Sequence, residues 1–500
     1  MAALGHGKGA RVNERALVVG GSVAGLASAL ALARAGVRVL VLEKDAEPLP
    51  ASPAAAFAGW QRQGVPQARH SHAFLARLLE LLRAREPSLL DALRAHGAEE
   101  IRFVDVVKKA LPGAALLPED DAIAVLACRR TTFEWALRRH VAALPEVEIR
   151  SGVAVTGLLA DAGAGGAPPR VRGALAGLQR FEADLVVDAS GRRSRLRHWL
   201  AAIGARRPRE HSEPCGIFYS SRFYRARAGS PPPSLDGPMG ADYGFLKVGV
   251  FPGDARSWSV TLAASPDDPP LRALTRADAF EALASALPLT APWVDPVMAE
   301  AQGDVHAMTG LRNTRRFLVE DGEPLALGVA AVGDALIHTN PIVGRGCTLA
   351  FVNSYLLADA WRESAGAPRE FALALESAVE REIVPWYEAM LAQDRDAIRV
   401  MQMLRDGEDP YRVNRDDGSV DPAAWLRVLL RDGFVPALRE DAAVLRTFLR
   451  LFNLLDAPSD LMKDPGLLAR VLASYARRDT RADPPQPTRA EVVTRLAALA

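Results

Sequence analysis

The chain has 500 residues, 61 of them Lys or Arg and 60 Asp or Glu, which leaves a formal net charge of +1. This balance argues against the strongly basic surface of a nucleic-acid-binding domain, so no nucleic acid partner is expected. With 49% hydrophobic and 24% charged residues, the composition is that of a globular protein, and extended disorder is excluded as the main state. The length suits about three domains.

Neither the cysteines nor the apolar stretches indicate export or membrane insertion. Cys128, Cys215 and Cys347 lie far apart and lack the spacing of a zinc site, which favours reduced thiols in a cytoplasmic protein. Residues 1–13 lack the apolar core of a signal peptide. The longest apolar stretch, residues 26–42, contains arginines and a glycine, so no transmembrane segment is expected.

The first elements have the pattern of a β-α-β unit. Residues 16–19 form a short apolar run typical of a buried parallel strand. Residues 24–35 predict a helix that stops at Gly36, and residues 37–42 predict a second buried strand. Units of this kind open many nucleotide-binding sheets.

Further along, the periodicity of apolar residues predicts helices and strands in turn. A polar, proline-rich passage lies at 47–66. Helices are expected after it over 73–83, 87–96 and 131–143. Most of the chain after residue 347 is also expected to be helical, apart from a polar loop at 405–422. Strands are expected over 103–126 with a turn at 112–113, over 147–191 around a loop at 162–169, and over 217–264 as a half-exposed antiparallel sheet. Residues 477–487 are expected to be a linker.

A glycine-rich turn joins the first strand to the first helix. Its sequence, Gly20-Gly21-Ser22-Val23-Ala24-Gly25, predicts a phosphate cradle, because glycine permits a tight turn and close approach of the backbone to a pyrophosphate. The helix N-terminus supplies N–H groups to the anion. Ser22 replaces the second glycine of the usual G-x-G-x-x-G pattern. Glu43, 18 residues after Gly25 and followed by Lys44, ends the second strand, where a carboxylate accepts hydrogen bonds from a ribose.

Two later segments also place acidic residues at strand ends. Asp188-Ala-Ser-Gly191 ends one apolar run, and Gly333-Asp334 ends another. The second continues through Asn340-Pro341-Ile-Val-Gly344-Arg345-Gly346 into a helix. Nucleotide-type strand ends spread over more than 300 residues are not the arrangement of a simple NAD domain.

With Gly64-Val-Pro-Gln-Ala-Arg-His-Ser-His72 and the helix from Arg130 to Leu137, these segments make the chain resemble the FAD-dependent monooxygenases of the para-hydroxybenzoate hydroxylase type. The similarity is greatest to the branch of the polyether epoxidases and squalene-epoxidase-like proteins, and it covers roughly residues 15–360. It implies an α/β fold: a discontinuous Rossmann-like FAD-binding domain with a mixed or parallel sheet, an inserted antiparallel-sheet substrate domain and a C-terminal helical region.

The resemblance also implies domain boundaries. The FAD-binding domain comprises residues 1–68, 127–200 and 316–365, the substrate domain 69–126 and 201–315, and the helical region 366–500.

The resemblance assigns roles near the cofactor. Glu43 binds the adenosine ribose, Arg130 reaches back to the FAD, Asp188 lies near the pyrophosphate and Asp334 bonds the ribityl chain. The loop Pro341–Gly346 lies under the isoalloxazine, where a helix N-terminus stabilises the negative charge of a reduced flavin. The predicted cofactor-binding residues are Gly20, Gly21, Ser22, Gly25, Glu43, Lys44, Arg130, Asp188, Gly191, Gly333, Asp334, Gly344 and Gly346. Candidates beside the flavin, none assigned a catalytic role, are Arg69, His70, Pro341, Gly344 and Arg345.

The segment from Gly64 to His72 allows two interpretations, neither of them a metal site. His70 and His72 lack a further His or carboxylate at ligand spacing, so no metal is predicted. By the resemblance the segment runs along the flavin, where Arg69 or His70 contacts it or controls access. The alternative is a loop that only packs against the helix at 73–83.

The substrate region concentrates aromatic residues, which suits an apolar or aromatic ligand, although any one of them is more readily a core residue. They are Phe218, Tyr219, Phe223, Tyr224, Tyr243, Phe245 and Trp258. Residues 424–454 combine an apolar face with arginines. Core packing is the default for them; a cover over the active site, a dimer contact and a membrane-surface helix are the alternatives.

The expected function is a monooxygenase of secondary metabolism. It hydroxylates or epoxidises a lipophilic or aromatic small molecule through a flavin C4a-hydroperoxide, with FAD as cofactor, NAD(P)H as electron donor and O2 as co-substrate. The sequence leaves open a separate flavin reductase and a homodimer.

Three alternatives remain. A dehydrogenase or reductase of the geranylgeranyl-reductase type shares the scaffold. A flavin halogenase is less favoured, because its W-x-W-x-I-P segment is missing: Trp60, Trp135 and Trp199 stand alone. A non-enzymatic FAD-binding scaffold is the least favoured.

Overall fold

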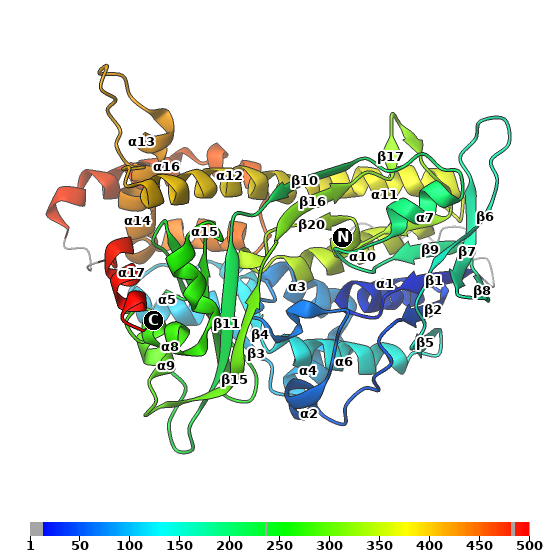
Figure 1. The fold of residues 1–500 in the computed structure, drawn as a ribbon, viewed down its shortest axis with the longest axis horizontal. Coiled ribbons are helices and arrows are strands. Elements are labelled where there is room, and N and C mark those ends of the chain that lie inside the picture. The colour runs from blue at the N-terminus through cyan, green and yellow to red at the C-terminus, as the bar shows by residue number, and fades with distance from the viewer. Residues whose placement is uncertain (1–13, 236–237, 482–485, 500) are drawn as a thin grey trace.

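The structure is a computed structural model that describes residues 14–235, 238–481 and 486–499 (Figure 1). The expectation that no signal peptide is present falls on residues 1–13, outside the described residues. Part of the predicted linker at 477–487 also lies outside them, and the linker begins with a 3-10 turn, Arg478–Thr480. No helix in the described ranges is long and apolar enough to cross a membrane.

A parallel sheet of five strands organises one half of the molecule. Its order is β19-β9-β1-β2-β5, and every neighbouring pair is parallel. The strands are β1 (Arg15–Val19), β2 (Arg38–Glu43), β5 (Val147–Ser151), β9 (Leu185–Asp188) and β19 (Val329–Ala331). Helix α1 (Val23–Arg34) connects β1 to β2, which confirms the predicted β-α-β unit. The carboxyl ends of all five strands therefore meet at one edge.

Helices on the faces of this sheet complete the first hydrophobic core. They are α3 (Ala76–Arg85), α4 (Pro87–Ala95), α6 (Arg130–Ala142) and α10 (Gly346–Glu363). The Ser28 hydroxyl on α1 lies 2.9 Å from that of Ser354 on α10, so small residues bring these two helices close together. Two flanking sheets are antiparallel: β3 (Glu99–Arg102) with β4 (Ala124–Ala127), and β6 (Gly157–Asp161), β7 (Arg170–Ala176) and β8 (Gln179–Glu182).

A five-stranded antiparallel sheet organises the second half, in the order β12-β13-β14-β11-β15. The strands are β11 (Phe218–Ala226), β12 (Gly240–Asp242), β13 (Leu246–Pro252), β14 (Ser257–Ala264) and β15 (Ala299–Met308). One face packs on the short helices α8 (Ala277–Ala284), α9 (Ala291–Val294) and α17 (Arg489–Ala497) around a second core. The predicted antiparallel pairing is confirmed. The central strand β14 is buried along its whole length, because its other face meets the first half of the molecule, whereas β12 and β15 are partly exposed.

A small sheet and two long helices join the halves. Strands β10 (Glu210–Pro214), β16 (Arg312–Arg316) and β20 (Ile337–His338) pair antiparallel. Helices α11 (Pro368–Glu382) and α12 (Val384–Asp406) run along the top of the view in Figure 1. The predicted polar loop separates α12 from α13 (Pro422–Leu429), α14 (Val435–Glu440), α15 (Ala442–Phe452) and α16 (Pro465–Ala476).

The prediction of strands over residues 103–126 is wrong. The segment begins with helix α5 (Phe103–Ala110), and only β4 at its end is extended. Phe103, Val104 and Val107 are the buried residues of α5, a spacing that follows a helical turn instead of strand alternation. The apolar periodicity suggested a strand, but burial of one helical face decided the local structure.

Other short elements lie in loops. A helix not predicted from the proline-rich passage, α2 (Pro53–Gly59), begins where the Ser52 side chain accepts a hydrogen bond from the Ala55 N–H at 3.2 Å. Further short elements are α7 (Leu196–Ala202) and the hairpin of β17 (Val319–Glu320) and β18 (Glu323–Pro324). The domain boundaries stay a prediction; α3 and α4, from the predicted substrate domain, pack in the first core.

Candidate functional site

The glycine turn between β1 and α1 leaves no room for side chains. Gly20 has φ of +107°, and a Cβ there would lie 2.6 Å from the carbonyl oxygen of Ala189, at the end of β9. A Cβ on Gly25 would lie 1.8 Å from the Gly20 carbonyl oxygen. Both glycines are therefore required by the close approach of three backbone segments, as the sequence pattern predicts for a phosphate cradle.

Ser22 links this turn to helix α6 instead of capping α1. It occupies the N-cap of α1, yet its side chain makes no capping bond in the described structure. Its hydroxyl donates to Glu134 Oε2 at 3.0 Å and accepts from Arg130 Nη2 at 3.0 Å. The N–H groups of the first turn of α1 thus have no side-chain cap, and they are available to an anion.

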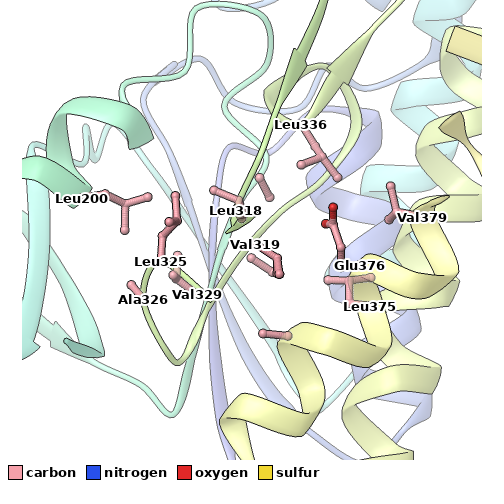
Figure 2. Close-up of a pocket in the computed structure, with 13 residues that line it drawn as sticks. Leu200, Leu318, Val319, Leu325, Ala326, Val329, Leu336, Leu375, Glu376 and Val379 are labelled. Carbon is pink, nitrogen blue, oxygen red and sulfur yellow. The ribbon is translucent and has the colours of Figure 1, made fainter. Parts of the chain in front are cut away.

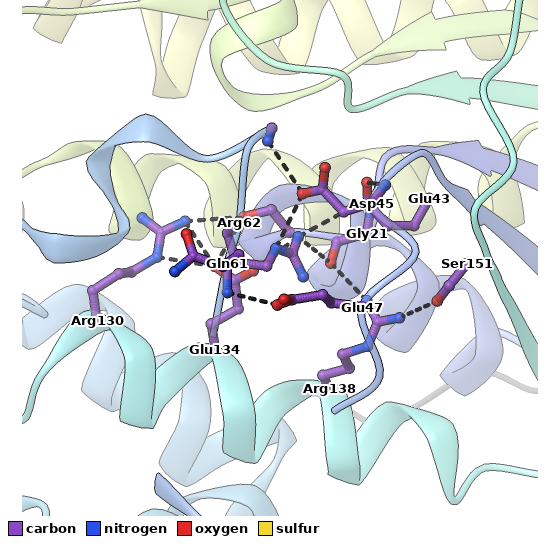
Figure 3. Close-up of polar contacts among 12 residues, drawn as sticks. Gly21, Glu43, Asp45, Glu47, Gln61, Arg62, Arg130, Glu134, Arg138 and Ser151 are labelled. Atoms are coloured by element: carbon purple, nitrogen blue, oxygen red, sulfur yellow. Dashed lines mark hydrogen bonds and ion pairs between the residues drawn. The ribbon is translucent and has the colours of Figure 1, made fainter. Parts of the chain in front are cut away.

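Glu43, at the end of β2, belongs to a buried cluster of charged groups (Figure 3). Its Oε2 accepts from the Gly21 N–H at 2.8 Å and from Arg62 Nη2 at 3.1 Å, and its Oε1 accepts from the Asp45 N–H at 2.9 Å. The Arg62 guanidinium also lies 3.1 Å from Glu134 Oε1. Burial would raise the pKa of Glu134, but Arg62 and a second arginine hold it below its usual value.

That second arginine, Arg130, connects three of the predicted segments. It is the first residue of α6, and its side chain is 5% exposed. Its Nη2 donates to Ser22 in the glycine turn, and its Nη1 lies 3.1 Å from His72 Nε2 and 3.3 Å from the Cys347 sulfur on α10. An ion pair with Glu134 at 3.2 Å compensates its charge.

Sequence reasoning missed Arg62, Glu134 and Arg138. Arg138 donates to the Gly21 carbonyl oxygen at 3.3 Å. Glu134 and Arg138 follow Arg130 at intervals of four residues, which places all three on one face of a helix; that spacing was available in the sequence. Arg62 carries no such signal, because it lies in an irregular passage and reaches the cluster only through the tertiary fold.

Asp188 and Gly191 lie at the same edge of the parallel sheet. Asp188 ends β9, beside Val19 of β1. Its carboxylate accepts from the Ser190 N–H at 2.9 Å and from the Ser194 hydroxyl, and burial raises its pKa. The carboxylate is therefore engaged within its own turn. Gly191, with φ of +80°, lets the chain turn there.

Gly333 and Asp334 follow β19, one strand further along this edge. The Gly333 N–H donates to Asn353 Oδ1 on α10 at 3.1 Å, and a Cβ on Gly333 would lie 2.9 Å from that of Ala24 on α1. The Asp334 side chain is 30% exposed and lies 4.0 Å from His338. Asp334 is thus open to further contacts.

The loop after β20 ends at the N-terminus of α10. Pro341–Val343 form a 3-10 turn that closes on Gly344 at φ of +69°. A Cβ on Gly344 would lie 2.9 Å from that of Ala73, next to the segment Gly64–His72. Gly346 is the first residue of α10, and no described side chain caps that helix. Two uncapped helix N-termini, those of α1 and α10, therefore stand at the site.

Of the predicted charged residues here, Arg345 is half-buried and Lys44 is exposed. The Arg345 guanidinium lies 4.8 Å from the centre of the Trp386 ring on α12, and burial lowers its pKa to about 10. Its Nε has no hydrogen-bond partner in the described chain. Lys44 lies at the surface beside Gly64.

His70 and His72 point in different directions. His70 is 3% exposed; it lies 3.3 Å from the Ser221 hydroxyl on β11 and edge-on to Tyr219, with ring centres 4.8 Å apart. His72 Nδ1 donates to the His70 carbonyl oxygen at 2.9 Å, and its Nε2 accepts from Arg130. Burial lowers the pKa of each histidine to about 3, so both are neutral. Arg69 bonds the Ala58 carbonyl oxygen at 3.3 Å.

The aromatic residues divide between the two faces of the antiparallel sheet. Tyr219 and Phe223 face the first half of the molecule, where Phe223 meets Phe57 with ring centres 5.1 Å apart. His306 lies opposite Ser221 on β15. The others are in, or pack against, the second core: Phe218, Tyr224, Tyr243, Phe245 and Trp258. Strand alternation explains this division.

A separate cavity of about 20 Å³ lies away from these residues, between β19 and α11 (Figure 2). Leu325, Val329, Leu375 and neighbouring apolar side chains line it, and Glu376 points toward it. Such a volume holds about one water molecule. Burial, with Glu380 nearby, raises the pKa of Glu376 to about 7.

Comparison with known proteins agrees with this geometry. Residues 14–213 match the FAD binding domain family. Protein Rv3254 of Mycobacterium tuberculosis is 28% identical over 466 residues, which cover 89% of this chain and 90% of that protein. Among solved structures, the flavin-dependent brominase Bmp2 has a TM-score of 0.57 at 17% identity, covering 93% of this chain and 100% of its own. The p-nitrophenol 4-monooxygenase PnpA of Pseudomonas putida has a TM-score of 0.54 at 18% identity, covering 89% and 99%.

The chain therefore carries an FAD binding domain and has the fold of the FAD-dependent monooxygenases of the para-hydroxybenzoate hydroxylase type. The predicted fold class is confirmed, and so is the expected FAD-binding domain, whereas the monooxygenase family, the polyether-epoxidase branch and the role of each site residue stay predictions.

Proposed function

We propose that this protein is a monooxygenase that uses FAD, NAD(P)H and O2 to hydroxylate or epoxidise a lipophilic or aromatic small molecule. The observation that carries the proposal is the meeting of four segments at one edge of the parallel sheet. These are the glycine turn, Glu43, the turn at Asp188 and the segment at Gly333–Asp334. The buried face of the antiparallel sheet, with Tyr219 and Phe223, lies toward this half of the molecule.

The donors and the space at this edge fit FAD. The pyrophosphate would bind at the glycine turn and at the uncapped N-terminus of α1. Gly20 and Gly25 have no room for a side chain. Glu43 would accept a hydrogen bond from a ribose hydroxyl. Its Oε1 accepts one bond, from the Asp45 N–H, and keeps a second lone pair for the ribose. Asp334 would bond the ribityl chain. FAD, when bound, supplies the redox chemistry that activates oxygen.

The chain's own residues would bind and orient the substrate and exclude water. Tyr219, Phe223 and Met308 are buried apolar side chains of the sheet that would line the substrate site, which suits a lipophilic or aromatic molecule. His70 is neutral, so it can accept or donate one hydrogen bond without adding charge. The likeness to PnpA, whose substrate is p-nitrophenol, also supports an aromatic substrate.

A halogenase is the second candidate, because the similarity to the brominase Bmp2 spans 93% of this chain. The missing W-x-W-x-I-P segment still disfavours it. A reductase of the geranylgeranyl-reductase type would turn over without oxygen. The proposal includes a cytoplasmic location, which the three free and buried cysteines support. It also allows a separate flavin reductase and a homodimer.

The test is oxygen consumption by FAD-loaded protein with NADPH or NADH, with and without a flavin reductase, across phenolic and polyene compounds. We expect substrate-dependent oxygen uptake and incorporation of one ¹⁸O atom from ¹⁸O2 into the product. Halogenated product that requires bromide or chloride would favour the second candidate. Anaerobic turnover would favour the reductase, and the absence of any NAD(P)H oxidation would refute the enzyme.

A further inference from the structure

Asn340 fixes the start of the loop that leads to α10. It is 1% exposed. Its side-chain oxygen accepts from the Ile342 N–H at 3.2 Å, and its own backbone N–H donates to Asn313 Oδ1 on β16 at 2.7 Å. Both amide side chains thus have their oxygen atoms committed to backbone donors of the loop.

Their NH2 groups converge on one carboxylate, Asp394, in the middle of α12. Asn340 Nδ2 donates to Asp394 Oδ1 at 2.8 Å, and Asn313 Nδ2 donates to Asp394 Oδ2 at 2.7 Å. Asp394 is 5% exposed and Asn313 is fully buried. The three side chains therefore form a network in which each amide hydrogen bond has only one possible direction, and the Cys215 thiol also bonds the Asp394 carboxylate.

Only a side chain with two acceptors fits at position 394. If Asn313 rotated its amide, its NH2 would face the N–H of Asn340; if Asn340 rotated its own, its NH2 would face the N–H of Ile342. An asparagine at position 394 would consequently set one NH2 group against another. A buried donor without an acceptor is costly, so the loop would have to leave this conformation.

Helix α12 holds the same loop at two further places. Ile342 packs against the buried cluster that includes Met401 of α12, as does Ala397 of the same helix, and Arg345 lies over the ring of Trp386 near the beginning of α12. Contacts spread along α12 thus hold both ends of the loop. The helix lies outside residues 14–213, the part of the chain that matches the FAD binding domain.

We propose that Asp394 is a positioning residue, through which helix α12 completes the flavin site by holding the loop Asn340–Gly346 in its binding conformation. This inference rests on the proposed function and on the position under the isoalloxazine that the family resemblance implies for that loop. It gives helix α12 of the C-terminal region a definite role, which is to shape this loop.

The test compares Asp394→Asn with Asp396→Asn. Asp396 lies on the same helix but pairs with Arg427 and has a side chain 48% exposed. FAD titration of the folded apoproteins should show about tenfold weaker binding for D394N and unchanged binding for D396N. The visible circular dichroism of the bound flavin should change in D394N alone. A merely structural role would lower the melting temperature without altering the affinity or this spectrum.

A swap variant, Asn313→Asp with Asp394→Asn, provides the rescue. In this variant the carboxylate at position 313 accepts from the Asn340 N–H and from the amide NH2 at position 394. The amide oxygen at position 394 accepts from the Asn340 side chain. Every bond among the three side chains is thus restored. The swap should recover FAD affinity to within about twofold of wild type, including where D394N alone fails to fold. Wild-type-like binding by D394N, or a swap without recovery, overturns the inference. Failure of the folded wild-type protein to bind FAD would instead refute the proposed function, and the inference with it.

Discussion

Gly25→Ala tests whether the turn before α1 is built for close approach of the backbone. A Cβ on residue 25 would lie 1.8 Å from the Gly20 carbonyl oxygen and 2.9 Å from its carbonyl carbon. Non-bonded carbon and oxygen atoms lie about 3.3 Å apart or more. The peptide after Gly20 must therefore move by about 1.5 Å to admit one methyl group.

This displacement has a cost in both folding and binding. Overpacking of this kind lowers stability by about 1–3 kcal/mol. The moved peptide carries the Gly21 N–H, whose bond to Glu43 is 2.8 Å long, and a bond to a charged group is worth about 1.5–3 kcal/mol. We expect FAD affinity to fall by about a hundredfold, or about 2.7 kcal/mol.

The assay is titration of folded apoprotein with FAD, followed by quenching of flavin fluorescence. Gly59→Ala, at the end of α2, is the matched control, because no described atom lies within 4 Å of its new Cβ. It should bind FAD like the wild type. Wild-type affinity in folded Gly25→Ala would refute the close-approach reasoning, whatever its melting temperature.

Three other predictions concern ionisable groups. Glu376→Gln should stabilise the protein. Because the pKa of Glu376 is raised to about 7, the folded state holds this proton more tightly than the unfolded state does. The stability contributed by the protonated carboxyl is therefore present below the unfolded pKa and is lost as pH rises toward 7. The gain should be about 2 kcal/mol in urea unfolding at pH 8 and vanish near pH 4; an equal gain at both pH values would contradict it. Glu43→Ala should weaken FAD binding by about ten- to a hundredfold in fluorescence titration, because it removes a ribose acceptor and the partner of Arg62; an unchanged constant would count against that role. His70, with a pKa of about 3, should show no NMR titration between pH 5 and 8, and a midpoint above 6 would disprove its neutral burial.

The local pattern predicted the parts of the site that lie on regular elements. Gly20, Gly25 and Glu43 follow from strand–turn–helix periodicity, and the structure brings them to one edge with Asp188 and Asp334, as parallel strands require. Apolar periodicity indicated strands over residues 103–126, where burial of one face produced a helix over the first eight residues instead. Short β-branched runs remain ambiguous until their packing partners are known.

Contacts between distant segments could not be read from the sequence. Arg62 enters the charged cluster from an irregular passage, and Asp394 reaches Asn340 across 54 residues. Tyr219 and Phe218 are adjacent in the chain but face opposite sides of one sheet. Which face meets the cofactor half depends on how the two halves pack, and that is decided by tertiary contacts alone.

Quantification of the flavin bound to the purified chain tests the central claim most directly. Protein reconstituted with excess FAD and freed of unbound cofactor should release FAD on heating, one molecule per chain, and Gly25→Ala treated identically should release little. Release of FMN only, or of no flavin from correctly folded wild-type protein, would contradict the account.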